Sequence, residues 1–152
     1  HALLLVVFRM PKAMSKAAEP FCAGDSSLVF SNTTGDSGLG SVDCLSSTPN
    51  PAWFYIQIDN PGNLNFEIIQ SSGGFDDNGN PIGALLDVDF ALWGPYDNLD
   101  VCEGNTPPLN DIIACSYSPS ATEFASISNA QTGEYYIMLI TNFEGVSGSI
   151  LL

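Results

Sequence analysis

The sequence predicts an all-β protein built as an antiparallel β-sandwich. Segments in which apolar and polar residues alternate are separated by segments rich in Gly, Pro, Asn and Ser. The chain of 152 residues contains 14 Gly and 10 Pro, and only 13% of its residues are charged. A hydrophobic fraction of 45% is enough to build one buried core. Several short strands joined by such turns are typical of a sandwich.

The N-terminal part differs from the rest and predicts an extension strand. The run 2–8 is continuously apolar and is followed by Arg9 and Met10. Seven apolar residues are too few for a membrane-spanning helix, so no membrane span is expected here. Residues 15–20 have the composition of a linker. We therefore predict an N-terminal extension over 1–20, consisting of a strand and a linker, and a β-sandwich domain over 21–152.

Alternation and turn residues place the strands of the sandwich domain. The first half predicts a short strand at 28–30 and strands at 53–59 and 64–70, the last two joined as a hairpin by the Pro-Gly turn at 60–63. Segments 32–40 and 71–83 are polar loops. Beyond residue 94, a long excursion with a short helix at 98–102 precedes strands at 123–127, 134–141 and 149–152.

The segment 86–93 has the clearest alternation in the chain. Its even positions are all apolar and are expected to face the core: Leu86, Val88, Phe90 and Leu92. The odd positions Asp87 and Asp89 then share the opposite face. Two carboxylates on one strand face form either a solvated surface or a cation site.

Four cysteines, Cys22, Cys44, Cys102 and Cys115, predict two disulfides and an oxidising compartment. None has C-x-x-C spacing and the one histidine is His1, which argues against zinc. Three pairings are possible. The sequence-local pairing, Cys22–Cys44 with Cys102–Cys115, is favoured because each bond would close one long irregular segment.

The distribution of charge excludes some functions. The 3 basic residues are Arg9, Lys12 and Lys16, whereas all 17 acidic residues lie from Glu19 onward, giving a net charge of −14. A body without Lys or Arg has nothing to neutralise phosphate, so no nucleic-acid partner is expected. No Gly-rich phosphate loop, nucleophile elbow or histidine-containing ligand cluster is present in the sequence, and we predict that the protein is not an enzyme.

Several motifs in register resemble a known family. The motifs are Trp53–Asp59, the turn at 61–64, Asp87–Pro95, Gly133–Ile140 and Ser147–Leu151. Together they resemble bacterial pre-peptidase C-terminal (PPC-like) β-sandwich domains. Cys44–Tyr55, Ala114–Ser118 and Asn129–Tyr136 make the chain most similar to domains of secreted gliding-associated surface proteins of Bacteroidetes. The resemblance covers about 21–152, and implies a jelly-roll-like sandwich, export to the cell surface and no catalytic residues.

One loop predicts a calcium site. Asp76, Asn78 and Asn80 have the i, i+2, i+4 spacing of the first half of a calcium loop, and Asp87 follows at the position of a closing carboxylate, with Asp89 beside it. Pro81 stands where such a loop needs glycine, and strands flank it instead of helices. An ordinary turn remains the alternative. Ca²⁺ is therefore the only cofactor that the sequence suggests.

The aromatic residues offer a second kind of binding site. A carbohydrate platform for surface glycans is one interpretation, and a sandwich core with polar tips is the other. Alternation puts Tyr135 and Tyr136 on opposite faces, so that one of them belongs to the core. The residues concerned are Trp53, Tyr55, Trp93, Tyr96, Tyr135 and Tyr136.

The extension strand leads to the functional hypothesis. A strand with two apolar faces must be buried on both sides, either in its own sandwich or in a neighbour's by strand addition. Its separate linker, its opposite charge and its place outside the resemblance favour the neighbour. We therefore expect an extracellular, pilus-like structural subunit that assembles head-to-tail with copies of itself, the alternative being a non-catalytic calcium- or carbohydrate-binding accessory module of a secreted enzyme or adhesin. The predicted interface residues are Ala2, Leu3, Leu4, Leu5, Val6, Val7, Phe8, Arg9 and Met10.

Overall fold

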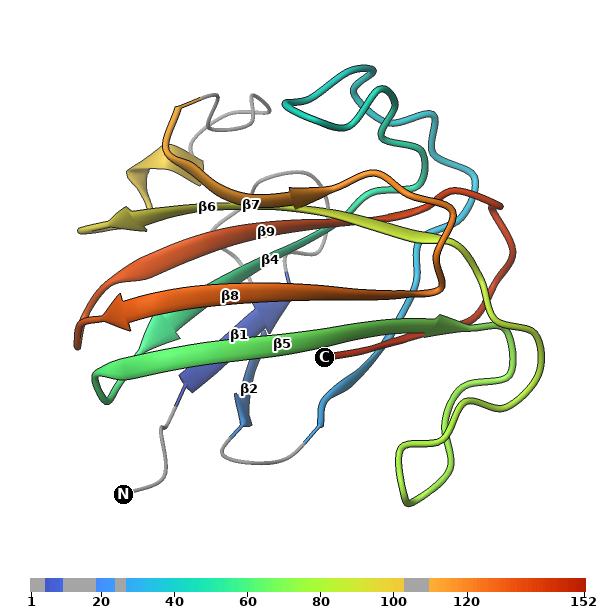
Figure 1. The fold of residues 1–152 in the computed structure, drawn as a ribbon, viewed down its shortest axis with the longest axis horizontal. Helices are drawn as coiled ribbons and strands as arrows, with labels where there is room; N and C mark the ends of the chain where they lie inside the picture. Colours follow the sequence, from blue (N-terminus) through green and yellow to red (C-terminus); the bar gives the residue numbers. More distant parts are fainter. Residues whose placement is uncertain (1–4, 10–18, 24–26, 103–109) are drawn as a thin grey trace.

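The computed structural model describes residues 5–9, 19–23, 27–102 and 110–152, and at 5–9, 19–23 and 102 it describes the backbone only. Figure 1 shows the long strands β5, β6, β8 and β9 running along the longest axis of the molecule. The elements are β1 (Leu5–Arg9), β2 (Glu19–Ala23), β3 (Val29–Ser31), β4 (Ala52–Ile58), β5 (Gly62–Ser71), β6 (Val88–Tyr96), the 3₁₀ helix η1 (Asp100–Cys102), β7 (Ile112–Ser116), β8 (Thr122–Ala130), β9 (Tyr135–Asn142) and β10 (Ser149–Leu151).

The strands form two antiparallel sheets, which confirms the predicted sandwich. One sheet has six strands in the order β2-β1-β4-β9-β6-β7, and the other has four in the order β3-β10-β5-β8. Each is stabilised by pairs of strands that are distant in sequence, such as β4 with β9 and β5 with β8. The described part of the chain has no α-helix, and the short helix expected at 98–102 is present only as the 3₁₀ helix η1.

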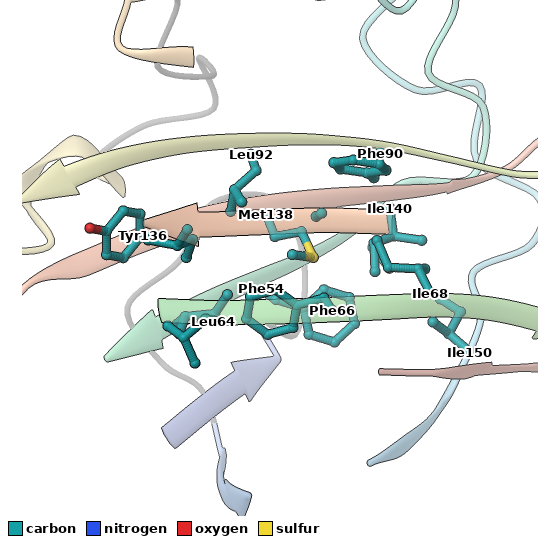
Figure 2. Packing of buried hydrophobic residues seen from close by; sticks show 14 of the residues in the cluster. Phe54, Leu64, Phe66, Ile68, Phe90, Leu92, Tyr136, Met138, Ile140 and Ile150 are labelled. Carbon is teal, nitrogen blue, oxygen red and sulfur yellow. The ribbon is translucent and has the colours of Figure 1, made fainter. Parts of the chain in front are cut away.

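Both sheets contribute side chains to one inner core (Figure 2). Phe54, Leu92 and Met138 of the six-stranded sheet pack with Leu64 and Phe66 of the four-stranded sheet. Of the predicted inward residues, Val88, Phe90 and Leu92 belong to the inner core, and Leu86 is buried just before β6 begins. Alternation therefore identified the core face of β6 correctly, because a strand with one face in an apolar core must place every second residue there.

The predicted hairpin of 53–59 with 64–70 is wrong. The two strands exist as β4 and β5, but they lie in different sheets, where β4 pairs with β1 and β9 and β5 pairs with β8 and β10. The turn between Ile58 and Gly62 therefore crosses from one layer to the other. The pattern of each strand specifies which residues it buries, and it does not specify which strand lies beside it.

The N-terminal strand β1 lies in the six-stranded sheet of its own chain. It is antiparallel to both neighbours, with Val6 opposite Gln57 of β4 and opposite Cys22 of β2. The boundary predicted at residue 20 falls inside β2. Residues 2–4 and Met10 of the predicted interface, and Lys12 and Lys16, lie outside the described residues.

Most other elements match the sequence prediction. The strands expected at 28–30, 86–93, 123–127, 134–141 and 149–152 correspond to β3, β6, β8, β9 and β10, and η1 occupies part of the expected helix at 98–102. Two strands were not predicted, namely β2 and β7. The run Ile112-Ile113-Ala114 is the apolar signal that could have identified β7.

Candidate functional site

The outer face of the six-stranded sheet carries a second apolar cluster. Its members are Val42, Leu45, Trp53, Tyr55, Ala91, Trp93, Ile137 and Leu139. The turn 42–45, closed by two backbone hydrogen bonds between Val42 and Leu45, packs onto this face. Trp93 is fully buried, stacks on Trp53 at 6.0 Å between ring centroids, and donates a 2.7 Å hydrogen bond from Nε1 to Asp43 Oδ2.

A disulfide fastens the same turn to the edge of the sheet and corrects the predicted pairing. Cys44 is bonded to Cys115 of β7, with their Cα atoms 6.2 Å apart. The predicted bonds Cys22–Cys44 and Cys102–Cys115 are therefore both wrong, because burial of Val42 and Leu45 on the outer face carries Cys44 to β7. The side chains of Cys22 and Cys102 lie outside the described set, so the structure describes this one disulfide.

The aromatic residues serve mainly as core. Trp53, Tyr55, Trp93 and Tyr136 are buried, which contradicts a carbohydrate platform built from them. Tyr136 packs in the inner core and the half-buried Tyr135 on the outer cluster, as alternation predicts. Tyr96 also packs against the outer cluster.

Where the outer face of β6 becomes acidic, the structure has a cavity of about 180 Å³, which we call the acidic pocket. Its lining residues are Asp87, Asp89, Tyr117, Ser118, Pro119 and Phe143. They come from the start of β6 and the residue before it, from the connection between β7 and β8, and from the residue that follows β9. Asp87 and Asp89 thus share one face, as predicted, and both line the cavity on that face.

Hydrogen bonds hold the floor and the rim of the acidic pocket in place. Asp89 Oδ1 accepts a 3.0 Å bond from the Ser118 amide, and the Ser118 hydroxyl donates to Glu123 at 2.5 Å. At the rim, Tyr117 and Phe143 meet edge to face with ring centroids 6.3 Å apart. The Tyr117 hydroxyl lies 3.2 Å from Ser47 Oγ. Both rings are partly exposed and flank the carboxylates.

The electrostatic environment of this pocket is unfavourable for its own carboxylates. Burial, and secondarily the neighbouring Asp87, raise the pKa of Asp89 to about 6. Burial, followed by the charges of Glu144 and Glu123, also raises the pKa of Asp87. Residues 17–152 contain no Lys or Arg, so this part of the chain supplies no cation to offset the four carboxylates.

The predicted calcium ligands are not all brought together. Asp76 Oδ1 accepts 2.9 Å bonds from the amides of Asn78 and Asn80, and Asp76 Oδ2 accepts one from the Asn80 side chain at 3.0 Å. These bonds, above all those from Asn80, lower the pKa of Asp76. Asp87 and Asp89 line the acidic pocket, whose lining does not include this turn. Among the described residues no group of three or more His, Cys, Asp or Glu is placed to hold a metal ion.

The position of β1 between β2 and β4, which we call the β1 slot, is the second candidate site. Six of the seven residues of β4 are buried, with Phe54, Ile56 and Ile58 in the inner core and Trp53 and Tyr55 in the outer cluster. A strand that is apolar on both faces is unsuited to the edge of a sheet, where its backbone groups would also stay unpaired. The backbone of β1 covers that edge from Leu5 to Arg9.

Comparison with known proteins leaves the chain without an assigned family. No family model matches it, and no curated protein matches it significantly. In the part of the chain that the structure describes, no helix is long and apolar enough to cross a membrane. Sequence reasoning missed Tyr117, Ser118, Pro119 and Phe143 as site residues, because they become neighbours of Asp87 only through the pairing of β6 with β7 and β9.

Proposed function

We propose that this protein is a non-catalytic structural subunit of an extracellular filament or surface appendage. In the isolated chain, β1 fills its own β1 slot. In the assembly, the β1 strand of one copy occupies the β1 slot of the next. The observation that carries this proposal is the lining of the slot by β4, an almost fully buried strand that requires a partner along this edge.

Strand exchange is physically suited to this position. β1 is the first described strand, and residues 10–18 separate it from β2. Since β1 lies between β2 and β4, the β1 strand of a neighbouring copy has to fill the same place and pair with both of them. The same antiparallel register satisfies the same backbone groups in either arrangement. Exchange of an identical element costs little energetically, and a heterologous head-to-tail contact that does not close produces a filament.

Export and the lack of catalysis are supported by separate observations. The Cys44–Cys115 disulfide is typical of proteins that mature in an oxidising compartment. Sequence-wide, His1 is the only histidine, and residues 17–152 contain no Lys or Arg to act as a base, a nucleophile or a phosphate ligand. These features support an extracellular structural role.

A cross-linking experiment tests the exchange directly. Val6 of β1 and Gln57 of β4 are Cα partners, and partners in antiparallel strands lie about 4.5–5.5 Å apart, within the range of a disulfide. One preparation carries Val6→Cys and another Gln57→Cys, both in a Cys22→Ser background, because Cys22 is also a Cα partner of Val6. The two are unfolded together, refolded and mildly oxidised, then separated by electrophoresis without reductant. Only exchange between copies can join one variant to the other.

The proposal predicts a covalent dimer in the mixture and none in either variant alone. The double variant Val6→Cys/Gln57→Cys is the matched control and should form covalent multimers. A double variant that cross-links only within monomers, together with a mixture that stays uncoupled, would show that β1 never leaves its own chain. If either variant unfolds, Leu5→Cys and Ile58→Cys give the same test, because Leu5 and Ile58 are the adjacent pair of Cα partners.

A further inference from the structure

We infer that the acidic pocket binds the guanidinium group of an arginine side chain presented by a polypeptide. The site is independent of the β1 slot, because it lies on β6, β9 and the β7–β8 connection, whereas the slot lies between β2 and β4. A chain that assembles through β1 and a chain that does not could both use it.

One carboxylate oxygen that lines the pocket has no partner among the described residues, and neither has a hydroxyl on a residue that does not line it. Asp87 Oδ1 is buried and accepts no hydrogen bond from any described residue, and the Thr141 hydroxyl is equally buried and unpaired. Thr141 is fully buried and lies directly opposite Asp89 in the pairing of β6 with β9, which places both side chains on the same face of the sheet. Buried polar groups are nearly always paired in native proteins, so these groups indicate a missing donor.

The missing donor should carry a positive charge. Asp87 and Asp89 are within electrostatic range of one another and of Glu123, and Asp87 also of Glu144. Within residues 17–152 there is no Lys or Arg that could pair with them. Burying carboxylates without a counter-charge is costly, and a cationic ligand removes that cost on binding.

The shape and the lining of the pocket favour a planar organic cation over a metal ion. Calcium takes 6–8 oxygen ligands, whereas Tyr117, Pro119 and Phe143 form apolar walls here. Aromatic faces attract cations, and guanidinium stacks on them more often than ammonium does. Its five donors can reach several oxygens at once. A cavity of about 180 Å³ is large enough for such a group.

The test is a titration of the whole chain that is monitored by nuclear magnetic resonance. The probe is N-acetyl-arginine amide, and the reporter is the Ser118 amide, which donates to Asp89. N-acetyl-citrulline amide is the neutral control of the same shape, and CaCl₂ tests the metal. We expect saturable shifts at Ser118 with the arginine probe, with a dissociation constant on the order of 1 mM for so small a ligand. Citrulline should bind at least tenfold more weakly.

Two substitutions show whether the shifts come from this pocket. Asp87→Asn keeps the shape of the side chain and removes its charge, and we expect at least a tenfold loss of arginine affinity. Asp76→Asn makes the same change in the exposed turn between β5 and β6 and should leave the affinity unchanged. Phe143→Leu, at a partly exposed position, should weaken binding about two- to fivefold through loss of the cation–π contact.

The outcomes separate clearly. Equal binding of citrulline, or unchanged affinity in Asp87→Asn, would overturn the inference, and so would calcium that displaces the arginine probe and shifts Ser118 more strongly. The variant Arg9→Gln/Lys12→Gln/Lys16→Gln identifies the source of the cation. Probe binding that becomes several-fold tighter in this variant shows that the chain's own basic residues compete for the pocket, whereas unchanged binding assigns the arginine to a different protein.

Discussion

The two ends of the outer face of the six-stranded sheet contrast sharply, although they belong to the same strands. At one end, Trp93 and Ala91 of β6 lie opposite Ile137 and Leu139 of β9, under the turn 42–45. At the other end, Asp89 lies opposite Thr141, and the face opens into the acidic pocket. Within four residues of β6, the outer face of the sheet therefore changes from a covered apolar cluster to buried polar groups without partners.

The apolar end of this face contributes to stability, whereas the acidic end is suited to binding. The apolar end has its cover within the chain, held by the Trp93–Asp43 hydrogen bond and the Cys44–Cys115 disulfide. The acidic end keeps carboxylates whose ionisation opposes folding. Proteins tolerate such local cost where a ligand offsets it, so we expect substitutions at the two ends to change stability in opposite directions.

The largest effect should come from Trp93→Ala at the apolar end. Removal of a fully buried indole leaves a cavity and an unpaired Asp43, and we expect the free energy of unfolding to fall by about 3–5 kcal/mol. Urea unfolding followed by circular dichroism measures it. Trp93→Phe separates the lost hydrogen bond from the lost volume and should cost less. A loss below about 1 kcal/mol for Trp93→Ala would contradict the view that the apolar end stabilises the fold.

The next effect should come from removing the disulfide with Cys44→Ser. The bond joins residues 71 positions apart, and its loss should lower the free energy of unfolding by roughly 2–4 kcal/mol through the entropy of the unfolded chain. Differential scanning calorimetry of the variant and the parent measures the change. Cys115→Ser should give the same loss, and the double variant should add nothing further. Additive losses would mean that the two cysteines act separately.

From the alternation of apolar and polar residues, the sequence predicts which side chains share a face of a strand. It predicts only in part which other elements cover that face. The inward residues of β6 and the shared face of Asp87 and Asp89 follow from the period of the strand. The partners of β4 could not be predicted in this way, because both of its faces are apolar and any apolar strand would satisfy them. A preference for local contacts therefore produced the hairpin of β4 with β5, which the structure contradicts.

The same limit applies to the disulfide and the candidate site. Cys44 reaches β7 because Val42 and Leu45 bury themselves on the outer face, a contact between residues far apart in sequence. The pocket forms where Tyr117 and Phe143 meet beside Asp87, and these three residues come from three different parts of the chain. The carboxylates could be identified from the sequence, whereas the aromatic rim depends on the register between strands.

At the acidic end, Asp89→Asn should stabilise the protein. The pKa of Asp89 rises from the ordinary 3.8 to about 6 on folding, so the folded protein holds this proton more tightly than the unfolded chain does. Its contribution to stability is therefore complete below pH 3.8 and is lost as the pH rises through about 6. Asparagine is neutral throughout and still accepts the Ser118 hydrogen bond.

We expect a gain of about 1 kcal/mol at pH 7 in Asp89→Asn, kept modest because water enters the mouth of the pocket, and no gain below pH 4. Thermal melts from pH 4 to pH 8 measure this as a difference of about 2–4 °C at neutral pH. Asp97→Asn makes the same charge change at an exposed position and is the matched control for the loss of one negative charge. Destabilisation of Asp89→Asn at pH 7 would show that the carboxylate already has a counter-charge.

The smallest expected effect concerns calcium. Asp76 directs both carboxylate oxygens at N–H donors of Asn78 and Asn80, and calcium would have to displace those donors, since an N–H cannot face a cation. We therefore expect the melting temperatures in a chelator and in millimolar CaCl₂ to agree within about 1 °C. A rise with CaCl₂ that disappears in Asp76→Asn would instead establish the calcium loop. A rise that disappears only in Asp87→Asn would place calcium in the acidic pocket and would argue directly against the arginine inference.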